Sequence, residues 1–277
     1  MKQSAAFESN GWLVIPGLLD AIEVETVRAT LHSALAQPRP ACMNRPGNDL
    51  VLLRWDEPVI SQMLRSRERI ARLRELIGAD DLRWLSGYIS SKAPHSPALW
   101  WHQDWWCWDH PISFRRAATQ VAVLCYLTDT TAGNGALRVL SGSHRQSTPM
   151  HGHLPEPHGD EANSLAADHP AMMDCADQVT VPVRAGDAVV LDYRLLHGTH
   201  ANTTAARRDC ILLSFIVDWL RLPNELKAHC AMHPALPRDD EAEAAMASVY
   251  AGVLPPFSGS PASLSVNRVP PAIFQAR

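Results

Sequence analysis

Six short runs rich in β-branched and aromatic residues lie between residues 82 and 220, separated by turn-forming residues. Runs of this length and composition predict strands, and strands joined by turns instead of long helices pair in antiparallel fashion. Such strands bury their apolar faces in a sandwich or a barrel, so they restrict the chain to few folds. The runs are LRWLSGYIS (82–90), TQVAVLCYL (119–127), ALRVL (136–140), QVTVPV (178–183), AVVLDY (188–193) and CILLSFIVDWL (210–220).

Helical patterns dominate residues 1–80. Asp20 followed by Glu23 resembles a capping box, and apolar residues then recur on one helical face. A second helical region begins after Pro58 and ends at Gly78, a residue that commonly terminates helices. We therefore expect a mainly β protein in which an N-terminal helical layer packs on the strands.

The 277 residues are a normal length for one barrel or sandwich, so residues 1–277 are expected to form a single domain. Its β core is expected over 82–221. Within that core, residues 141–176 are polar, rich in His and Pro, and weakly periodic, which predicts a lid loop. Residues 222–277 predict one acidic helix near 239–251 and a tail rich in Pro and Ser.

Charge and cysteine usage restrict the partners and the compartment. The net charge of −4 argues against nucleic acid and anionic membranes as partners. No secretory pattern opens the chain, and no apolar run approaches the length of a membrane helix. The six cysteines are scattered without a C-x-x-C pair. We expect a cytoplasmic protein, monomeric or homodimeric, that acts on a small molecule.

The stretch WWHQDWWCWDH (100–110) suggests a metal site. If His102 and Asp104 lie on a strand, alternation points both side chains to one face, where they can share an ion. The pair is a weak signal by itself, because a second His-x-Asp pair, His158 and Asp160, lies in a Pro- and Gly-containing surface stretch. His197, directly after an expected strand, is the candidate for the third ligand.

Two arginines follow His197 at the start of the last expected strand. Arg207 alternates with the large apolar residues of this strand, whereas Arg208 alternates with a smaller and more polar set. A cavity favours the polar face, so Arg208 is the preferred anchor for a carboxylate, which guanidinium binds bidentately. In the sequence, only strand alternation favours Arg208 over Arg207 as the carboxylate anchor.

Together these motifs resemble the phytanoyl-CoA dioxygenase (PhyH-like) family. The matching segments are FESNGWLVIPGLLDAIEVETVR, HQDWW, GNGALRVLSGSHR, AGDAVVLDYRLLHGTHANTT and the Arg-Arg pair, and they cover roughly residues 7–220. The resemblance implies a double-stranded β-helix (jelly-roll, cupin-like) core. It also implies Fe(II) as the metal, with 2-oxoglutarate and O2 as co-substrates.

By the same resemblance, His102, Asp104 and His197 would be the catalytic iron ligands. Arg208 would bind the far carboxylate of 2-oxoglutarate, and Thr199 would contribute a hydroxyl group. Independently of the resemblance, Tyr88 lies on the expected strand before the site and could also contact the co-substrate. Trp105 and Trp106 directly follow the metal motif, so each is a candidate for the wall of the substrate pocket, although alternation would send the two neighbours to opposite faces.

The implied activity is hydroxylation of an unactivated C–H bond of a specialised-metabolite or amino-acid-like molecule, with release of succinate and CO2. The same iron chemistry diverted to desaturation or cyclisation stays open as an alternative. So does a non-catalytic jelly-roll protein that binds metal, and a jelly-roll enzyme that uses another metal for isomerisation or hydrolysis. Retention of Asp104 argues against halogenation, because related halogenases replace this carboxylate with a small residue.

Overall fold

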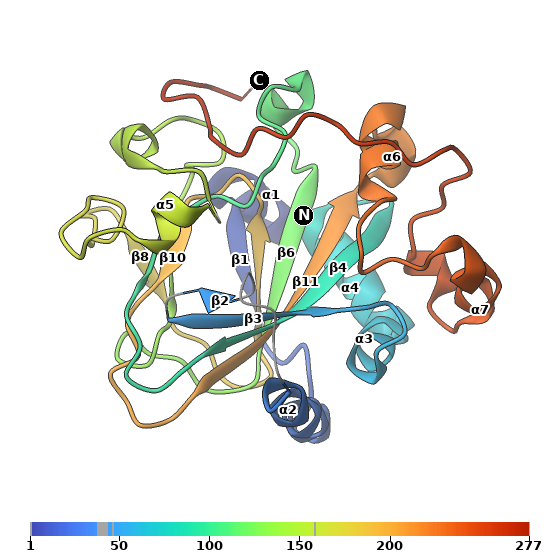
Figure 1. Ribbon diagram of the computed structural model, residues 1–277, viewed down its shortest axis with the longest axis horizontal. Coiled ribbons are helices and arrows are strands. Elements are labelled where there is room, and N and C mark those ends of the chain that lie inside the picture. The colour runs from blue at the N-terminus through green and yellow to red at the C-terminus, as the bar shows by residue number, and fades with distance from the viewer. Residues whose placement is uncertain (1, 38–43, 46, 158, 277) are drawn as a thin grey trace.

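Two antiparallel sheets form the core of the protein (Figure 1). The computed structural model describes residues 2–37, 44–45, 47–157 and 159–276. The large sheet has the order β1-β9-β6-β11-β4-β3-β2, and the small sheet has the order β5-β10-β7-β8. This two-sheet antiparallel architecture confirms the mainly β, jelly-roll fold class that the sequence predicts.

All six strands predicted from the sequence are present. They are β4 (Leu82–Lys92), β6 (Gln120–Tyr126), β7 (Leu137–Val139), β8 (Val179–Val181), β9 (Ala188–Asp192) and β11 (Arg208–Val217). β11 lies between β4 and β6 and pairs with both along most of its length. Since helices or the facing sheet cover both of its sides, β11 is buried almost throughout.

The prediction that residues 1–80 are helical is only partly right. The helices are α1 (Lys2–Asn10), α2 (Ala21–Leu35), α3 (Pro58–Leu64) and α4 (Arg67–Ile77). However, β1 (Trp12–Ile15), β2 (Asn44–Arg45) and β3 (Asn48–Leu53) extend both edges of the large sheet. Segments of four or six residues carry too little periodicity to distinguish a strand from a helix, and pairing with β9 and β4 decides the outcome.

The helices cover the outer face of the large sheet. Val24, Val27 and Leu31 of α2 are buried in the same apolar core as the strands. α3 packs closely on β4 at Gly87, where an added Cβ would lie 2.5 Å from Cδ1 of Ile60. The glycine therefore permits a close helix–sheet contact that a larger residue would prevent.

None of the described residues of 141–176 lines the cavity described below, so their expected role as a lid stays a prediction. The segment, which includes α5 (Asp160–Asn163), instead covers the tryptophans of β5 (Leu99–His102). Trp100 packs against Ala162 and Ala171, and Trp101 packs near Met150 and Leu154. Two adjacent large indoles on one strand need cover on both sides, and this long segment provides it.

The C-terminal region holds more structure than predicted. The acidic helix corresponds to a 3-10 turn (Asp239–Glu241) followed by α7 (Ala242–Ala247). A further helix, α6 (Asn224–Cys230), was not predicted, and the tail after α7 runs back across the molecule (Figure 1). No helix in the described ranges is long and apolar enough to cross a membrane.

Lys92, at the end of β4, is fully buried. Its Nζ donates to the carbonyl oxygens of Gly47 at 3.1 Å and Pro97 at 2.6 Å, so it ties the β2–β3 turn to a neighbouring loop. Burial, reinforced by the positive charges of Arg208 and Arg138, lowers the pKa of Lys92 to about 7. A charged lysine in this position therefore carries a cost in folding free energy.

We expect the stability of the protein to depend on pH through Lys92. The unfolded chain keeps this lysine protonated up to about pH 10, whereas the folded chain releases the proton near pH 7. Because the unfolded state binds more protons between these values, the free energy of unfolding rises with pH, by about 1 kcal/mol per unit just above neutrality. Chemical denaturation of Lys92→Met at several pH values should lack this increment.

Lys227→Met is the matched control, since Lys227 donates to the carbonyl of Leu220 at an exposed position. Its unfolding free energy should follow the wild-type pH profile. Parallel profiles for wild type and Lys92→Met would contradict a role for Lys92 in the pH dependence.

Candidate metal centre

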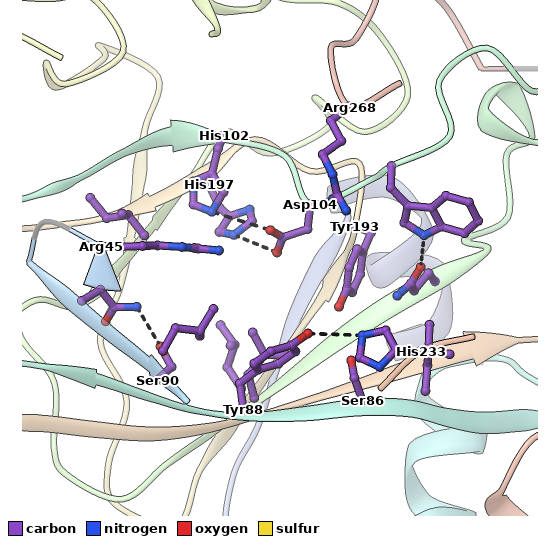
Figure 2. A pocket seen from close by; sticks show the side chains of 18 of the residues that line it. Arg45, Ser86, Tyr88, Ser90, His102, Asp104, Tyr193, His197, His233 and Arg268 are labelled. Atoms are coloured by element: carbon purple, nitrogen blue, oxygen red, sulfur yellow. Dashed lines mark hydrogen bonds and ion pairs between the residues drawn. The ribbon is translucent and has the colours of Figure 1, made fainter. Parts of the chain in front are cut away.

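Three potential metal ligands converge between the two short strands β5 and β10 (His197–Thr199). His102 ends β5, His197 begins β10, and the two residues pair directly across the strands. Nε2 of His102 lies 3.8 Å from Oδ1 of Asp104, and Nε2 of His197 lies 3.6 Å from Oδ2 (Figure 2). One ligand atom from each residue lies within 4.8 Å of the others, so the three could hold one metal ion.

Backbone contacts orient both histidine rings. Nδ1 of His102 lies 2.9 Å from the carbonyl oxygen of Trp100, and Nδ1 of His197 lies 3.0 Å from that of Leu195. A carbonyl can only accept, so Nδ1 carries the proton in each ring. This tautomer directs the Nε2 lone pairs of His102 and His197 towards the shared centre.

Asp104 does not lie on the same strand as His102, contrary to the expectation from alternation. β5 ends at His102, and the backbone then turns. The N–H groups of Asp104 and Trp105 both donate to the carbonyl oxygen of Tyr193, each at 2.9 Å. This shared acceptor, the first residue of the turn between β9 and His197, brings the Asp104 carboxylate to the histidines.

Arg208 and Thr199 both line the cavity that contains the three ligands. The Arg208 guanidinium is buried, lies 5.7 Å from the centre of the Tyr126 ring, and donates to Oδ1 of Asn48 at 3.4 Å. Among the described residues, neither Nε of Arg208 nor Oγ1 of Thr199 has a hydrogen-bond partner. Buried polar groups seldom remain unpaired, and a bound carboxylate would accept a hydrogen bond from each.

Arg207 faces the opposite side of β11 and is not among the residues that line the cavity. Its Nη2 bonds to Asp49 at 2.6 Å and to Ser91 at 3.0 Å. Strand alternation therefore sends the two neighbouring arginines to different surroundings, with Arg208 in the cavity.

The two tryptophans expected at the pocket wall occupy different positions. Trp106 lines the cavity, donates to Oε1 of Gln120 at 2.8 Å and stacks on His229 with ring centres 4.7 Å apart. Trp105 is not among the cavity-lining side chains that the structure describes. It is buried in the core and donates to Ser113 at 2.8 Å.

Three further side chains that line the cavity, Tyr88, Tyr193 and His233, are uncharged at neutral pH. The hydroxyl of Tyr88 lies 3.3 Å from Nε2 of His233 (Figure 2). Burial, reinforced by His229 and Arg268, lowers the pKa of His233 to about 4. Burial raises the pKa of Tyr88 and of Tyr193. At neutral pH both phenols and this imidazole are therefore uncharged.

The cavity has a volume of about 380 Å3, within the range of small-molecule sites. Several of its side chains could not be found from the sequence. Asn48 comes from β3, Arg45 from β2, and His229, His233 and Arg268 come from the C-terminal region. No motif or spacing distinguishes these residues, because packing of distant segments brings them to the site. The second His-x-Asp pair stays untested, since His158 lies outside the described residues.

The sequence model of the family described as Phytanoyl-CoA dioxygenase (PhyH) matches residues 7–210. The chain is 26% identical over 215 residues to ectoine dioxygenase of Halomonas elongata, with 72% of this chain and 64% of that protein aligned. It is also 26% identical over 221 residues to L-proline trans-4-hydroxylase of Streptomyces griseoviridis, with 74% and 81% aligned. The chain thus spans a little less than two thirds of the Halomonas elongata relative.

Solved structures share the fold. The epimerase SnoN in complex with Fe3+, alpha ketoglutarate and nogalamycin RO superposes with a TM-score of 0.60 at 24% identity, covering 97% of this chain and 96% of SnoN. HygX from Streptomyces hygroscopicus with nickel and 2-oxoglutarate bound gives a TM-score of 0.59 at 23% identity, covering 78% and 87%. At these identities the likeness concerns the fold alone.

Removal of the Asp104 carboxylate should abolish metal binding at this centre. Asp104→Ala should weaken Fe(II) binding by more than about 100-fold, since even the outer partners of metal ligands typically contribute 10- to 100-fold. Anaerobic Fe(II) titration with metal analysis measures the effect. Asp109→Ala is the matched control, because the exposed Asp109 lies on the same segment and contacts Asn267. Equal Fe(II) binding by the two variants would exclude Asp104 as a ligand.

Proposed function

The chain belongs to the phytanoyl-CoA dioxygenase family, and on this premise we propose that it is an Fe(II)- and 2-oxoglutarate-dependent dioxygenase. It hydroxylates an unactivated C–H bond of a small molecule, with release of succinate and CO2. The observation that carries the proposal is the convergence of two histidines, one aspartate and Arg208 on one cavity. The relatives named for ectoine and L-proline support a specialised-metabolite or amino-acid-like substrate.

In this proposal His102, Asp104 and His197 are the iron ligands. Two histidines and one carboxylate on one face of an octahedron leave three positions open, which is the arrangement of non-haem Fe(II) oxygenases. The donor set fits Fe(II), because both Nε2 atoms and the carboxylate face one centre. The backbone carbonyls that hold each Nδ1 keep the rings in the tautomer that binds metal.

Arg208 is proposed to bind the far carboxylate of 2-oxoglutarate, with Thr199 as a further donor. The unpaired Nε of Arg208 and Oγ1 of Thr199 support this assignment. Asn48 and Tyr126 hold the guanidinium in place, so little side-chain entropy is lost on binding. Tyr88 lines the same cavity and is retained as a proposed contact of the co-substrate.

When bound, iron and 2-oxoglutarate supply the O2 activation and oxidative decarboxylation that the side chains cannot perform. The protein positions the substrate and excludes water. Trp106, Tyr193 and Leu212 wall the cavity with largely buried aromatic and aliphatic surface. Such a wall limits contact of reactive species with solvent. A non-catalytic role is disfavoured because the ligand set and Arg208 face one cavity of substrate size.

We further propose that residues 1–277 act as one domain, as a monomer or homodimer without nucleic acid or membrane partners. The net charge of −4 supports the absence of nucleic acid. A cytoplasmic location is proposed because Cys107, Cys125, Cys175, Cys210 and Cys230 are all free thiols.

Anaerobic addition of Fe(II) and then 2-oxoglutarate should produce a metal-to-ligand charge-transfer absorption band. In Arg208→Gln the 2-oxoglutarate concentration for half of the full band should rise by about tenfold or more, because a charge-assisted hydrogen bond is lost. Arg207→Gln is the matched control, since Arg207 binds Asp49 on the other side of β11. It should leave the titration unchanged.

Folded, Fe(II)-loaded protein without the band would overturn the dioxygenase proposal. Equal effects of the two arginine substitutions would overturn the assignment of Arg208 but leave the activity standing. With a substrate present, succinate formation should match consumption of 2-oxoglutarate.

A further inference from the structure

Two more arginines line the cavity and have no role in the function proposed above. Arg45 belongs to β2 and Arg268 to the C-terminal tail. In Figure 2 the Arg45 side chain extends from the left and the Arg268 side chain from above, both towards the space beside Asp104. Among the described residues, neither guanidinium forms a hydrogen bond or an ion pair within 4 Å.

The backbone around each arginine is held in place. Arg45 pairs with Asn48 across the β2–β3 turn, and the carbonyl of Gly47 within that turn accepts a hydrogen bond from Lys92. The tail is attached at Asn267, whose carbonyl accepts from the N–H of Trp108 at 3.0 Å and whose amide donates to Asp109 at 2.7 Å. Both arginines are thus carried by segments fixed to elements of the site.

The charges around this space are unbalanced. Burial lowers the pKa of Arg45, the Asp104 carboxylate acts against this shift, and the positive charge of Arg268 adds to it. Asp104 is also a proposed ligand of iron, and a carboxylate bound to a metal cation neutralises less of the positive charge of either arginine. Cations held near each other in a cavity are costly unless an anion joins them.

The co-substrate does not account for this pair. Its two carboxylates are proposed to bind Arg208 at one end and the metal at the other, which leaves Arg45 and Arg268 for the substrate. The phenols of Tyr88 and Tyr193 line the same cavity and can donate further hydrogen bonds to an anion.

We propose that Arg45 and Arg268 form a subsite for an anionic oxyacid group of the substrate, a carboxylate or a phosphate. Contact with this group fixes which C–H bond of the substrate faces the metal centre. The inference rests on the proposed function and narrows its substrate class to small anionic molecules.

Calorimetric titration of the anaerobic protein, saturated with Fe(II) and 2-oxoglutarate, tests the subsite. The probes are benzoate, benzamide and phenyl phosphate, which share a ring and differ in charge. At least one of the two anions should bind about tenfold or more tightly than benzamide, because charged hydrogen bonds to arginine are lost with the amide. The stronger of the two anions identifies the oxyacid.

Arg45→Gln and Arg268→Gln should each remove this preference while leaving the 2-oxoglutarate titration of the charge-transfer band unchanged. The unchanged band also shows that the variants are folded. Arg221→Gln, at an exposed position just after β11, is the matched control and should keep the preference. Benzamide binding as tightly as both anions, or a preference that survives both substitutions, would overturn the proposal. Weakened 2-oxoglutarate binding in Arg45→Gln would assign Arg45 to the co-substrate and overturn it too.

Failure of the proposed function gives a different result. In that case the wild type shows no charge-transfer band, and the same titrations are made without metal or co-substrate in Arg208→Gln, which removes the other anion site. If the Arg208→Gln protein prefers an anion over benzamide, and a second substitution, Arg45→Gln or Arg268→Gln, removes that preference, the subsite is supported independently of the activity. If the Arg208→Gln protein shows no such preference, the subsite is overturned.

Discussion

Pairing between β5 and β10 is the interaction on which the site depends. It places His102 directly opposite His197, although the two residues are far apart in the sequence. Backbone carbonyls two residues before each histidine then set the ring orientation. The carbonyl of Tyr193 turns the chain after β5 so that Asp104 joins them. The centre is therefore built on main-chain contacts, which position side chains more rigidly than side-chain packing alone.

The large sheet forms the cavity wall that faces the metal centre, and it carries Arg208, the arginine proposed to bind the carboxylate of 2-oxoglutarate. β11 is central in this sheet, and its alternation separates Arg208, in the cavity, from Arg207, which pairs with Asp49 outside it. Segments from both ends of the chain complete the cavity. β2, at the edge of the large sheet, carries Arg45 and the C-terminal tail carries Arg268, so the part proposed to select the substrate comes from an edge strand and the tail.

Much of this organisation could be predicted from local pattern. Long strands such as β4 and β11 have enough residues for their composition to be diagnostic, and alternation along β11 distinguished two adjacent arginines. The failures share one physical cause. β5 and β10 are three or four residues long and carry no usable periodicity, so Asp104 was expected on a strand that ends before it. The contacts of Trp105 with Ser113 and of residues 141–176 with Trp100 could not be predicted from local pattern.

The sequence by itself determined the jelly-roll class, the family and the identity of the candidate ligands, because strand composition and motif order are local properties of the chain. The tertiary structure alone decided that His102, Asp104 and His197 meet at one point, and that Arg45 and Arg268 face the same space. Those juxtapositions depend on strand register and on how the β2–β3 pair and the C-terminal tail pack against the other strands. Such contacts join residues distant in sequence, and no local pattern encodes the distance between them.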